Sequence, residues 1–203
     1  MKTLSKSLTN YIIRKGMVDK TDREIYEYGF QITMELGIFI FFCVLLSVIT
    51  GMIKEGVLFF VIFAPLRSYA GGLHLEKYAS CLVLSCLTFG GILLVVKCIE
   101  VPAALSLILL FVLELAVYLL YPVENVNRLV DEDENVYFKK KLRIFLIADM
   151  MIAIVCLIVG SGSMLFLITA TFLMVTITMS IGKYKNNKAV TLDEVDLSPM
   201  QKL

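Results

Sequence analysis

Long apolar stretches separated by short polar segments dominate the chain. Six apolar runs follow one another: Leu36–Met52, Gly56–Leu66, Ala79–Val96, Ala103–Tyr121, Leu142–Val159 and Ser163–Ile181. Most of them approach the roughly 20 residues with which a helix spans a bilayer. They show no alternation with a period of two, so we interpret them as helices and not as strands of a barrel. The pattern therefore predicts an all-α, polytopic membrane protein with six transmembrane helices.

The composition supports this interpretation and excludes an ordinary soluble domain. Hydrophobic residues make up 59% of the 203 residues and charged residues only 18%, and the mean hydropathy is +0.84. The five cysteines are scattered in or beside the apolar runs, which indicates neither a disulfide framework nor a zinc site. We interpret all of them except Cys81 as packing residues. We expect no metal ion, no cofactor and no nucleic acid among the ligands.

The positive charges predict an orientation. If six helices cross the bilayer from a cytoplasmic N-terminus, seventeen of the nineteen Lys and Arg residues lie on the cytoplasmic side. Only Lys54 and Lys97 then lie outside, as the positive-inside rule expects of short loops. Both termini are therefore predicted to be cytoplasmic.

The second apolar run needs a separate argument, because Gly56–Leu66 is too short to cross a bilayer as a helix. If this run turned back, the basic segment Lys139–Lys141 would be exported, against the charge rule. We therefore expect its helix to continue through Ser68 and Tyr69, with Arg67 reaching the interface.

Both ends of the chain are more polar. Residues 3–15 gather four apolar side chains on one helical face: Leu4, Leu8, Tyr11 and Ile12. Residues 21–24 have the form of a capping box that opens the next helix. We therefore divide the single membrane domain, 1–203, into three parts: an amphipathic cytoplasmic segment (1–34), a six-helix bundle (35–182) and a flexible cytoplasmic tail (183–203).

The segment RSYAGGLHLEKYASC, residues 67–81, interrupts the apolar pattern and contains the single histidine of the chain. His74 is predicted in a cytoplasmic loop and Cys81 about one turn inside the next helix. A cysteine attacks as thiolate and an imidazole can take its proton, so the two form a candidate nucleophile and base. On one continuous helix they would stand about 10.5 Å apart along the axis, so the loop must fold back, which Gly71 and Gly72 permit. The helix start adds free N–H groups that can hold an oxyanion.

Other charged residues have two interpretations each. Arg67 either reaches the membrane interface or binds a substrate carboxylate and stabilises developing charge. Glu114 and Asp149 lie inside predicted helices at similar depth, where an acid is a functional candidate. They either orient His74 from a polar cavity under the loop, or are protonated or bonded to neighbouring helices.

The pattern Arg67-x-Tyr69-Ala70-Gly71-Gly72-x-His74 followed by Cys81 resembles the AgrB family, the membrane cysteine endopeptidases of Gram-positive peptide quorum sensing. A second stretch, Tyr121–Arg128 followed by Lys139–Lys141, resembles the proline-led, basic loop that these proteins carry after their fourth span. The resemblance covers nearly the whole chain. It implies a bacterial cell-membrane protein whose active site faces the cytoplasm.

The resemblance also implies a reaction. The substrate would be an AgrD-like precursor with an amphipathic leader, a ring-forming segment and an acidic tail. Cys81 would attack the scissile carbonyl, with His74 as base and then acid, and a nucleophile of the precursor would close a thiolactone or lactone. The glycine pair 71–72 would allow close approach of the substrate, or would serve only as a loop turn. Lys77 with Lys139–Lys141 would attract its tail, or would only set the orientation in the bilayer. We expect a homodimer in the lipid bilayer.

Two other classes of function compete with this one. A membrane transporter would use Glu114 and Asp149 and would not need Cys81. A sensor or scaffold subunit that partners a kinase would have no peptidase activity at all. A neighbouring reading frame for a short peptide with an acidic end would favour the protease.

Overall fold

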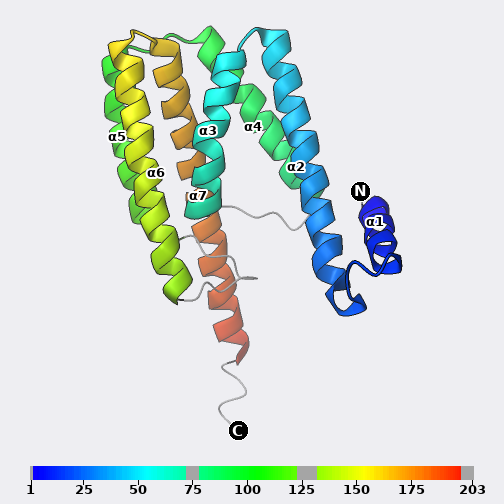
Figure 1. Cartoon of the computed structure of the whole chain (residues 1–203). Helices are drawn as coiled ribbons and strands as arrows, with labels where there is room; N and C mark the ends of the chain where they lie inside the picture. Colours follow the sequence, from blue (N-terminus) through cyan, green and yellow to red (C-terminus); the bar gives the residue numbers. More distant parts are fainter. Residues whose placement is uncertain (1, 72–77, 123–131, 198–203) are drawn as a thin grey trace.

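A computed structural model describes residues 2–71, 78–122 and 132–197, with side chains for residues 3–71, 80, 82–122 and 135–185. These residues form a 3-10 turn, η1 (Lys20–Asp22), and α-helices, with no strand among them. The helices are α1 (Lys2–Arg14), α2 (Arg23–Thr50), α3 (Ile53–Ala70), α4 (Tyr78–Cys98), α5 (Ala103–Leu120), α6 (Glu132–Ile158) and α7 (Gly162–Leu197) (Figure 1).

Each of the six apolar runs lies in one of the helices α2–α7, with at most two residues past the helix end, which confirms the all-α class. The second run extends as predicted, because α3 continues past Leu66 to Ala70. By length and composition, three helical stretches of the described chain suffice to cross a membrane: Lys20–Thr50, Ala103–Leu120 and Gly162–Lys185. Helix α4 adds a shorter apolar stretch, Leu82–Cys98. The protein is therefore a membrane protein, while six crossings remain a prediction.

Helices α2–α7 alternate in direction. The chain turns between α2 and α3, α4 and α5, and α6 and α7 at one end of the bundle, the upper end in Figure 1. We call this end the turn end. Helices α3 and α5 finish toward the opposite end, where α4 and α6 begin and α7 extends; we call it the loop end. Lys54 and Lys97 both belong to the turn end, as the charge pattern predicts.

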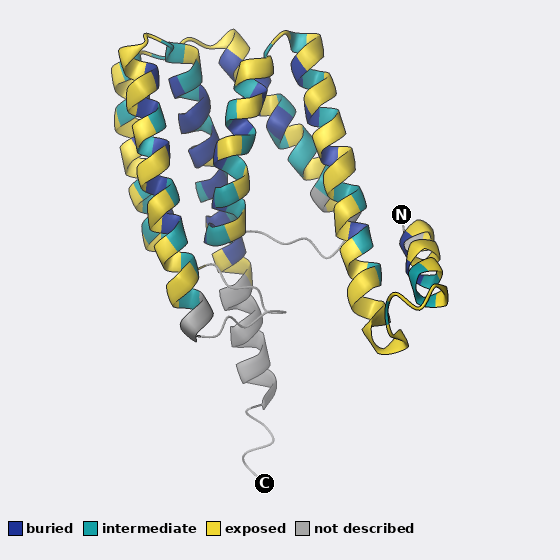
Figure 2. Cartoon of the chain, in the orientation of Figure 1, coloured by how far each residue is buried: buried dark blue, intermediate teal, exposed yellow. Residues whose placement is uncertain are grey.

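Two apolar clusters hold the bundle together, and α3 and α7 contribute to both. The first cluster joins α3, α5, α6 and α7, with Leu66 and Ile168 fully buried in it. The second joins α2, α3, α4 and α7 around Phe59 and Phe89, whose rings meet edge to face at 5.0 Å. Figure 2 shows the buried positions facing the middle of the bundle and exposed positions along the outer faces. Helix α3 is therefore fixed from both sides, and its last turn leads into the candidate loop.

Gly56 sets the close approach of α2 and α3. A Cβ at this position would collide with the Ser47 side chain and contact Phe89. We predict that Gly56→Ala lowers the free energy of unfolding by about 1–3 kcal/mol, because the added methyl group must displace the Ser47 side chain at the contact of α2 with α3. Melting of the purified protein would measure this. Gly91→Ala is the matched control, since nothing lies within 4 Å of its Cβ position; equal melting of both variants would contradict the prediction.

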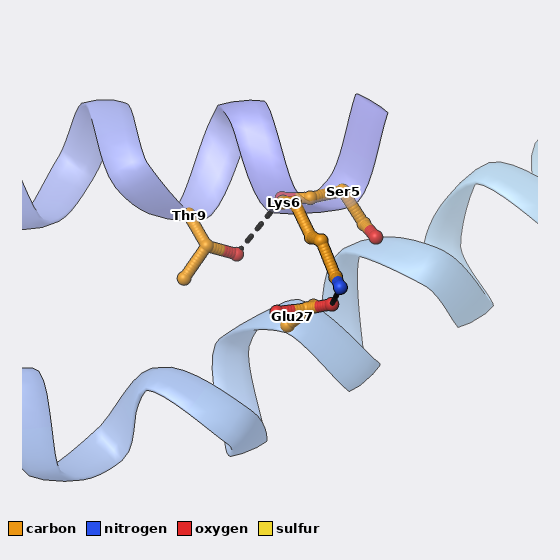
Figure 3. A network of polar contacts seen from close by, with 4 residues as sticks. All are labelled: Ser5, Lys6, Thr9 and Glu27. Atoms are coloured by element: carbon orange, nitrogen blue, oxygen red, sulfur yellow. Dashed lines mark hydrogen bonds and ion pairs between the residues drawn. The ribbon is translucent and has the colours of Figure 1, made fainter. Parts of the chain in front are cut away.

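Helix α1 packs against the first turns of α2 with its polar side (Figure 3). Ser5 and Thr9 are buried, and the Thr9 hydroxyl donates to the Ser5 carbonyl oxygen at 2.9 Å. The Lys6 ammonium lies 3.9 Å from the Glu27 carboxylate. The neighbouring apolar face stays exposed at Leu4, Leu8 and Tyr11, while Ile12 is partly buried, so α1 keeps an exposed apolar surface.

Both ends of the chain differ in detail from the sequence-based expectation. Helix α2 begins near the predicted position, but the capping box is wrong: Thr21 lies inside η1, and the N-cap is Asp22, which makes no side-chain cap bond. At the other end, α7 continues to Leu197 through most of the segment predicted as a flexible tail. No Pro or Gly lies between Lys183 and Leu197 to stop the helix, and Pro199 follows two residues later.

Candidate functional site

The end of α3 brings Arg67 onto the backbone of the glycine pair. The half-buried Arg67 donates from Nη1 to the Gly71 carbonyl oxygen at 3.1 Å. Gly71 has φ 79° and ψ −149°, a conformation that residues with a Cβ rarely adopt. The guanidinium thus lies beside the carbonyl groups that the helix end leaves without intrahelical partners. Arg67 is therefore placed to fix the first bend of the candidate loop.

Tyr69 links this bend to α6. Its ring stacks on Phe145 with centroids 5.3 Å apart and meets Phe138 edge to face at 5.9 Å. Sequence reasoning quoted Tyr69 as part of a motif but assigned it no role. The two phenylalanines are seven residues apart, which places both on one face of α6. This spacing is the sequence signal that could have indicated an aromatic contact surface on α6.

A basic surface forms where α5 ends and α6 begins. Lys139 lies over the Tyr118 ring at 5.8 Å, and Arg143 donates to the Tyr118 hydroxyl at 2.8 Å. Lys141 lies over the Tyr137 ring at 5.5 Å. We call Lys139, Lys140, Lys141 and Arg143 the basic cluster. Because Tyr69 packs on the same segment of α6, the basic cluster lies at the loop end of the bundle, where α3 finishes.

Cys81 is the fourth residue of α4, which begins at Tyr78. This confirms the prediction that it lies about one turn inside the helix, next to N–H groups that have no intrahelical partner. Its side chain, and all of Gly72, His74 and Lys77, lie outside the described residues. The predicted approach of His74 to Cys81 therefore stays a prediction.

The remaining cysteines have different surroundings. Cys43 and Cys156 are buried in the two apolar clusters, as expected of packing residues. Cys86 is partly buried beside the second cluster. Cys98 is exposed at the end of α4, so its prediction as a packing residue is wrong: it lies on the last turn, beyond the packed part of the helix.

Glu114 of α5 and Asp149 of α6 lie beside the first cluster. Asp149 is only 3% exposed, and Oδ2 of Asp149 and Oε1 of Glu114 are buried without a hydrogen-bond partner. The negative charge of Asp149 acts on the Glu114 carboxyl group, so the two are close in space. The sequence-based expectation of similar depth therefore agrees with the structure, while a role in orienting His74 is untested.

A cavity of about 500 Å³ lies elsewhere, at the turn end. Met52, Lys97, Glu100 and Phe166 are among its lining residues. It lies at the far end of α3 from Gly71, so it does not belong to the candidate loop.

Comparison with known proteins gives one positive result. A family model described as accessory gene regulator B (AgrB) matches residues 5–179 of the chain. The match includes the end of α3, the start of α4 and the basic cluster. Comparisons with curated proteins and with solved structures gave no match.

Proposed function

The chain belongs to the accessory gene regulator B family, and from this membership we propose that it is a membrane cysteine endopeptidase that acts on an AgrD-like precursor. Family membership indicates a role in processing autoinducing peptides. The proposal adds the mechanism: removal of the C-terminal tail through a Cys81 acyl-enzyme, followed by ring closure. The observation that carries it is the position of Cys81 in the first turn of α4, shortly after α3 ends at the positive φ of Gly71.

The reaction needs two acyl transfers. The Cys81 thiolate attacks the scissile carbonyl carbon after His74 has taken the thiol proton, and His74 returns this proton to the leaving amine of the tail. The precursor then remains bound to Cys81 as a thioester. A thiol or hydroxyl of the precursor loses its proton to His74 and attacks the thioester carbonyl. This step frees the thiol of Cys81 and closes a thiolactone or lactone ring.

Groups around the helix ends support this chemistry. Free N–H groups in the first turn of α4 can stabilise the oxyanion that forms at each attack. Arg67 holds the Gly71 carbonyl and so shapes the bend on which the loop begins. The glycine pair 71–72 allows substrate backbone to approach closely. Lys77 adds a cation near the start of α4.

The basic cluster is proposed to attract the acidic tail of the precursor. We predict that replacing Lys139, Lys140 and Lys141 together with Gln raises KM about tenfold and leaves kcat little changed, because three exposed charge contacts contribute about 0.5 kcal/mol each. The difference should shrink as salt rises. Lys54→Gln, at the turn end, is the matched control. A triple variant with unchanged KM at low salt would contradict this role.

The membrane is the second partner. An amphipathic leader on the precursor would bind the same bilayer surface and raise the local substrate concentration. We propose that both termini and the loop end face the cytoplasm, which requires six crossings by α2–α7. A homodimer is expected, since each copy is a small bundle with extensive exposed apolar faces.

The test uses the full-length protein in nanodiscs with two synthetic precursors. Both have an amphipathic N-terminal half and an acidic tail; one carries an internal cysteine and the other a serine at the same position. Mass spectrometry should show a free tail and a second product that is lighter by one water than the linear cleaved peptide. Samples quenched early should contain protein linked to the peptide by a bond that hydroxylamine breaks.

Each outcome decides between functions. A linear product alone would support the endopeptidase and reject cyclisation. No cleavage of either precursor would contradict the proposal and favour a transporter or a sensor subunit. The buried acids Glu114 and Asp149 are the observation that favours a transporter as the second candidate.

A further inference from the structure

Two acidic side chains lie beside the first cluster: Asp149 is buried and Glu114 is partly buried. Each is on the buried face of its helix, with buried apolar residues one turn before and after it: Leu110 and Val117 around Glu114, Leu146 and Ala153 around Asp149. Both helices also pack on α7, and α6 packs on α3. The two carboxyl groups therefore share one apolar environment between α5 and α6.

Neither acid has a partner that would stabilise its charge. Oε1 of Glu114 and Oδ2 of Asp149 are buried and accept no hydrogen bond from the described residues. Ser106, the other buried polar group without a partner for its side chain, lies eight residues before Glu114, roughly 12 Å along the helix. A lone buried carboxylate is strongly unfavourable, and two of them repel each other.

The packed elements supply no countercharge. Helix α7 has no charged residue from Gly162 to Gly182, and α5 has none besides Glu114. Three cations of the described helices that pack around the acids donate to other groups: Arg67, Arg143 and Lys183. None of them forms an ion pair with Glu114 or Asp149 in the part of the chain that the structure describes.

A metal ion would need more ligands than these two side chains. Hard cations take six or more oxygen ligands, and the described residues contain no group of three acidic, His or Cys side chains that would hold one. A proton needs only the two carboxyl groups, because one can donate the hydrogen bond that the other accepts.

We propose that Glu114 and Asp149 form a proton-binding site, in which one shared proton joins α5 to α6 through a carboxyl–carboxylate hydrogen bond. Loss of the proton leaves two like charges facing each other across the helix contact. This drives α5 and α6 apart and loosens the packing that places the basic cluster. The site thus couples proton concentration to the arrangement of α6, independently of the cysteine chemistry.

The sign of the pH dependence follows from the proton count. Above about pH 5, exposed carboxyl groups of the unfolded chain are ionised, while the folded chain keeps the shared proton. Stability therefore falls as pH rises, by about tenfold in the folding equilibrium constant per pH unit for one proton, until the folded site ionises too.

The experiment measures melting of the full-length protein in nanodiscs between pH 5 and 9. The variants are Glu114→Gln, Asp149→Asn and the double variant, with Glu100→Gln at the turn end as the matched control. Wild type and Glu100→Gln should lose melting temperature with rising pH, and the double variant should lose much less. Infrared spectra of wild type should show the C=O stretch of a buried protonated carboxyl group, which Asp149→Asn removes or shifts.

The spectrum keeps the proposal falsifiable even where a variant fails to fold, because it requires only the wild type. Absence of a protonated carboxyl band at pH 7 would overturn it. A double variant with the pH slope of wild type would do the same. The third contrary result is a higher melting temperature in sodium chloride than in choline chloride, without a protonated carboxyl band. It would indicate that a metal cation and not a proton binds at this site, and the proposal would be rejected.

Discussion

Cys81→Ala is expected to abolish tail release from the precursor, with a loss on the order of 10⁶-fold, because no other group can form the acyl-enzyme. Cys86→Ala is the matched control: Cys86 lies five residues further along the same helix and packs beside the second cluster. It should keep wild-type turnover within a small factor. Mass spectrometry of the released tail measures both variants.

The position of Cys81 makes this comparison informative. It lies on the first turn of α4, so an alanine, which favours helix, should not disturb the fold. Equal melting temperatures of Cys81→Ala and Cys86→Ala would show that the fold is equally intact in both variants. If Cys81→Ala still releases the tail, the proposed cysteine mechanism is wrong. If only Cys86→Ala loses activity, the nucleophile is Cys86 and not Cys81.

His74→Ala is expected to lower turnover by about 10²–10⁴-fold, the usual contribution of a general acid and base. Some activity should return as pH rises, because the Cys81 thiol then ionises without a base. The pH profile of turnover and the rate of Cys81 alkylation would measure both effects. If His74 has a purely structural role, His74→Ala should lower turnover equally at all pH values. If His74→Ala turns over at the wild-type rate, His74 takes no part in the reaction.

The sequence predicts the helices of the bundle well, because they depend on local physics. Apolar runs alone indicate all six, and the extension of α3 to Ala70 follows from the charge rule applied to a distant loop. The position of Cys81 within the first turn of α4 follows from where the polar segment stops. The sequence also indicates the two intramembrane acids, Glu114 and Asp149, because they stand inside apolar runs.

The sequence pattern does not predict the contacts between helices. The stacking of Tyr69 on Phe145 depends on how α3 and α6 pack, and apolar periodicity does not specify which faces meet. The bond from Arg67 to the Gly71 carbonyl depends on the backbone after the helix end, which the apolar pattern does not specify. The helical part of the tail was missed because polarity was taken as a sign of flexibility, although the segment lacks helix breakers.

In the described part of the chain, three basic side chains that enter the charge pattern also donate hydrogen bonds to carbonyl groups near helix ends. Arg67 and Lys183 do so at the loop end, and Lys97 donates to the Thr50 carbonyl oxygen at the turn end. Lys97 is one of the two exceptions to the charge rule, and closing the last turn of α2 is a reason for it to stand there. The residues behind the predicted orientation in the bilayer thus overlap with residues that close helix ends. A redesign that inverts the surface charge of this bundle would alter both at once.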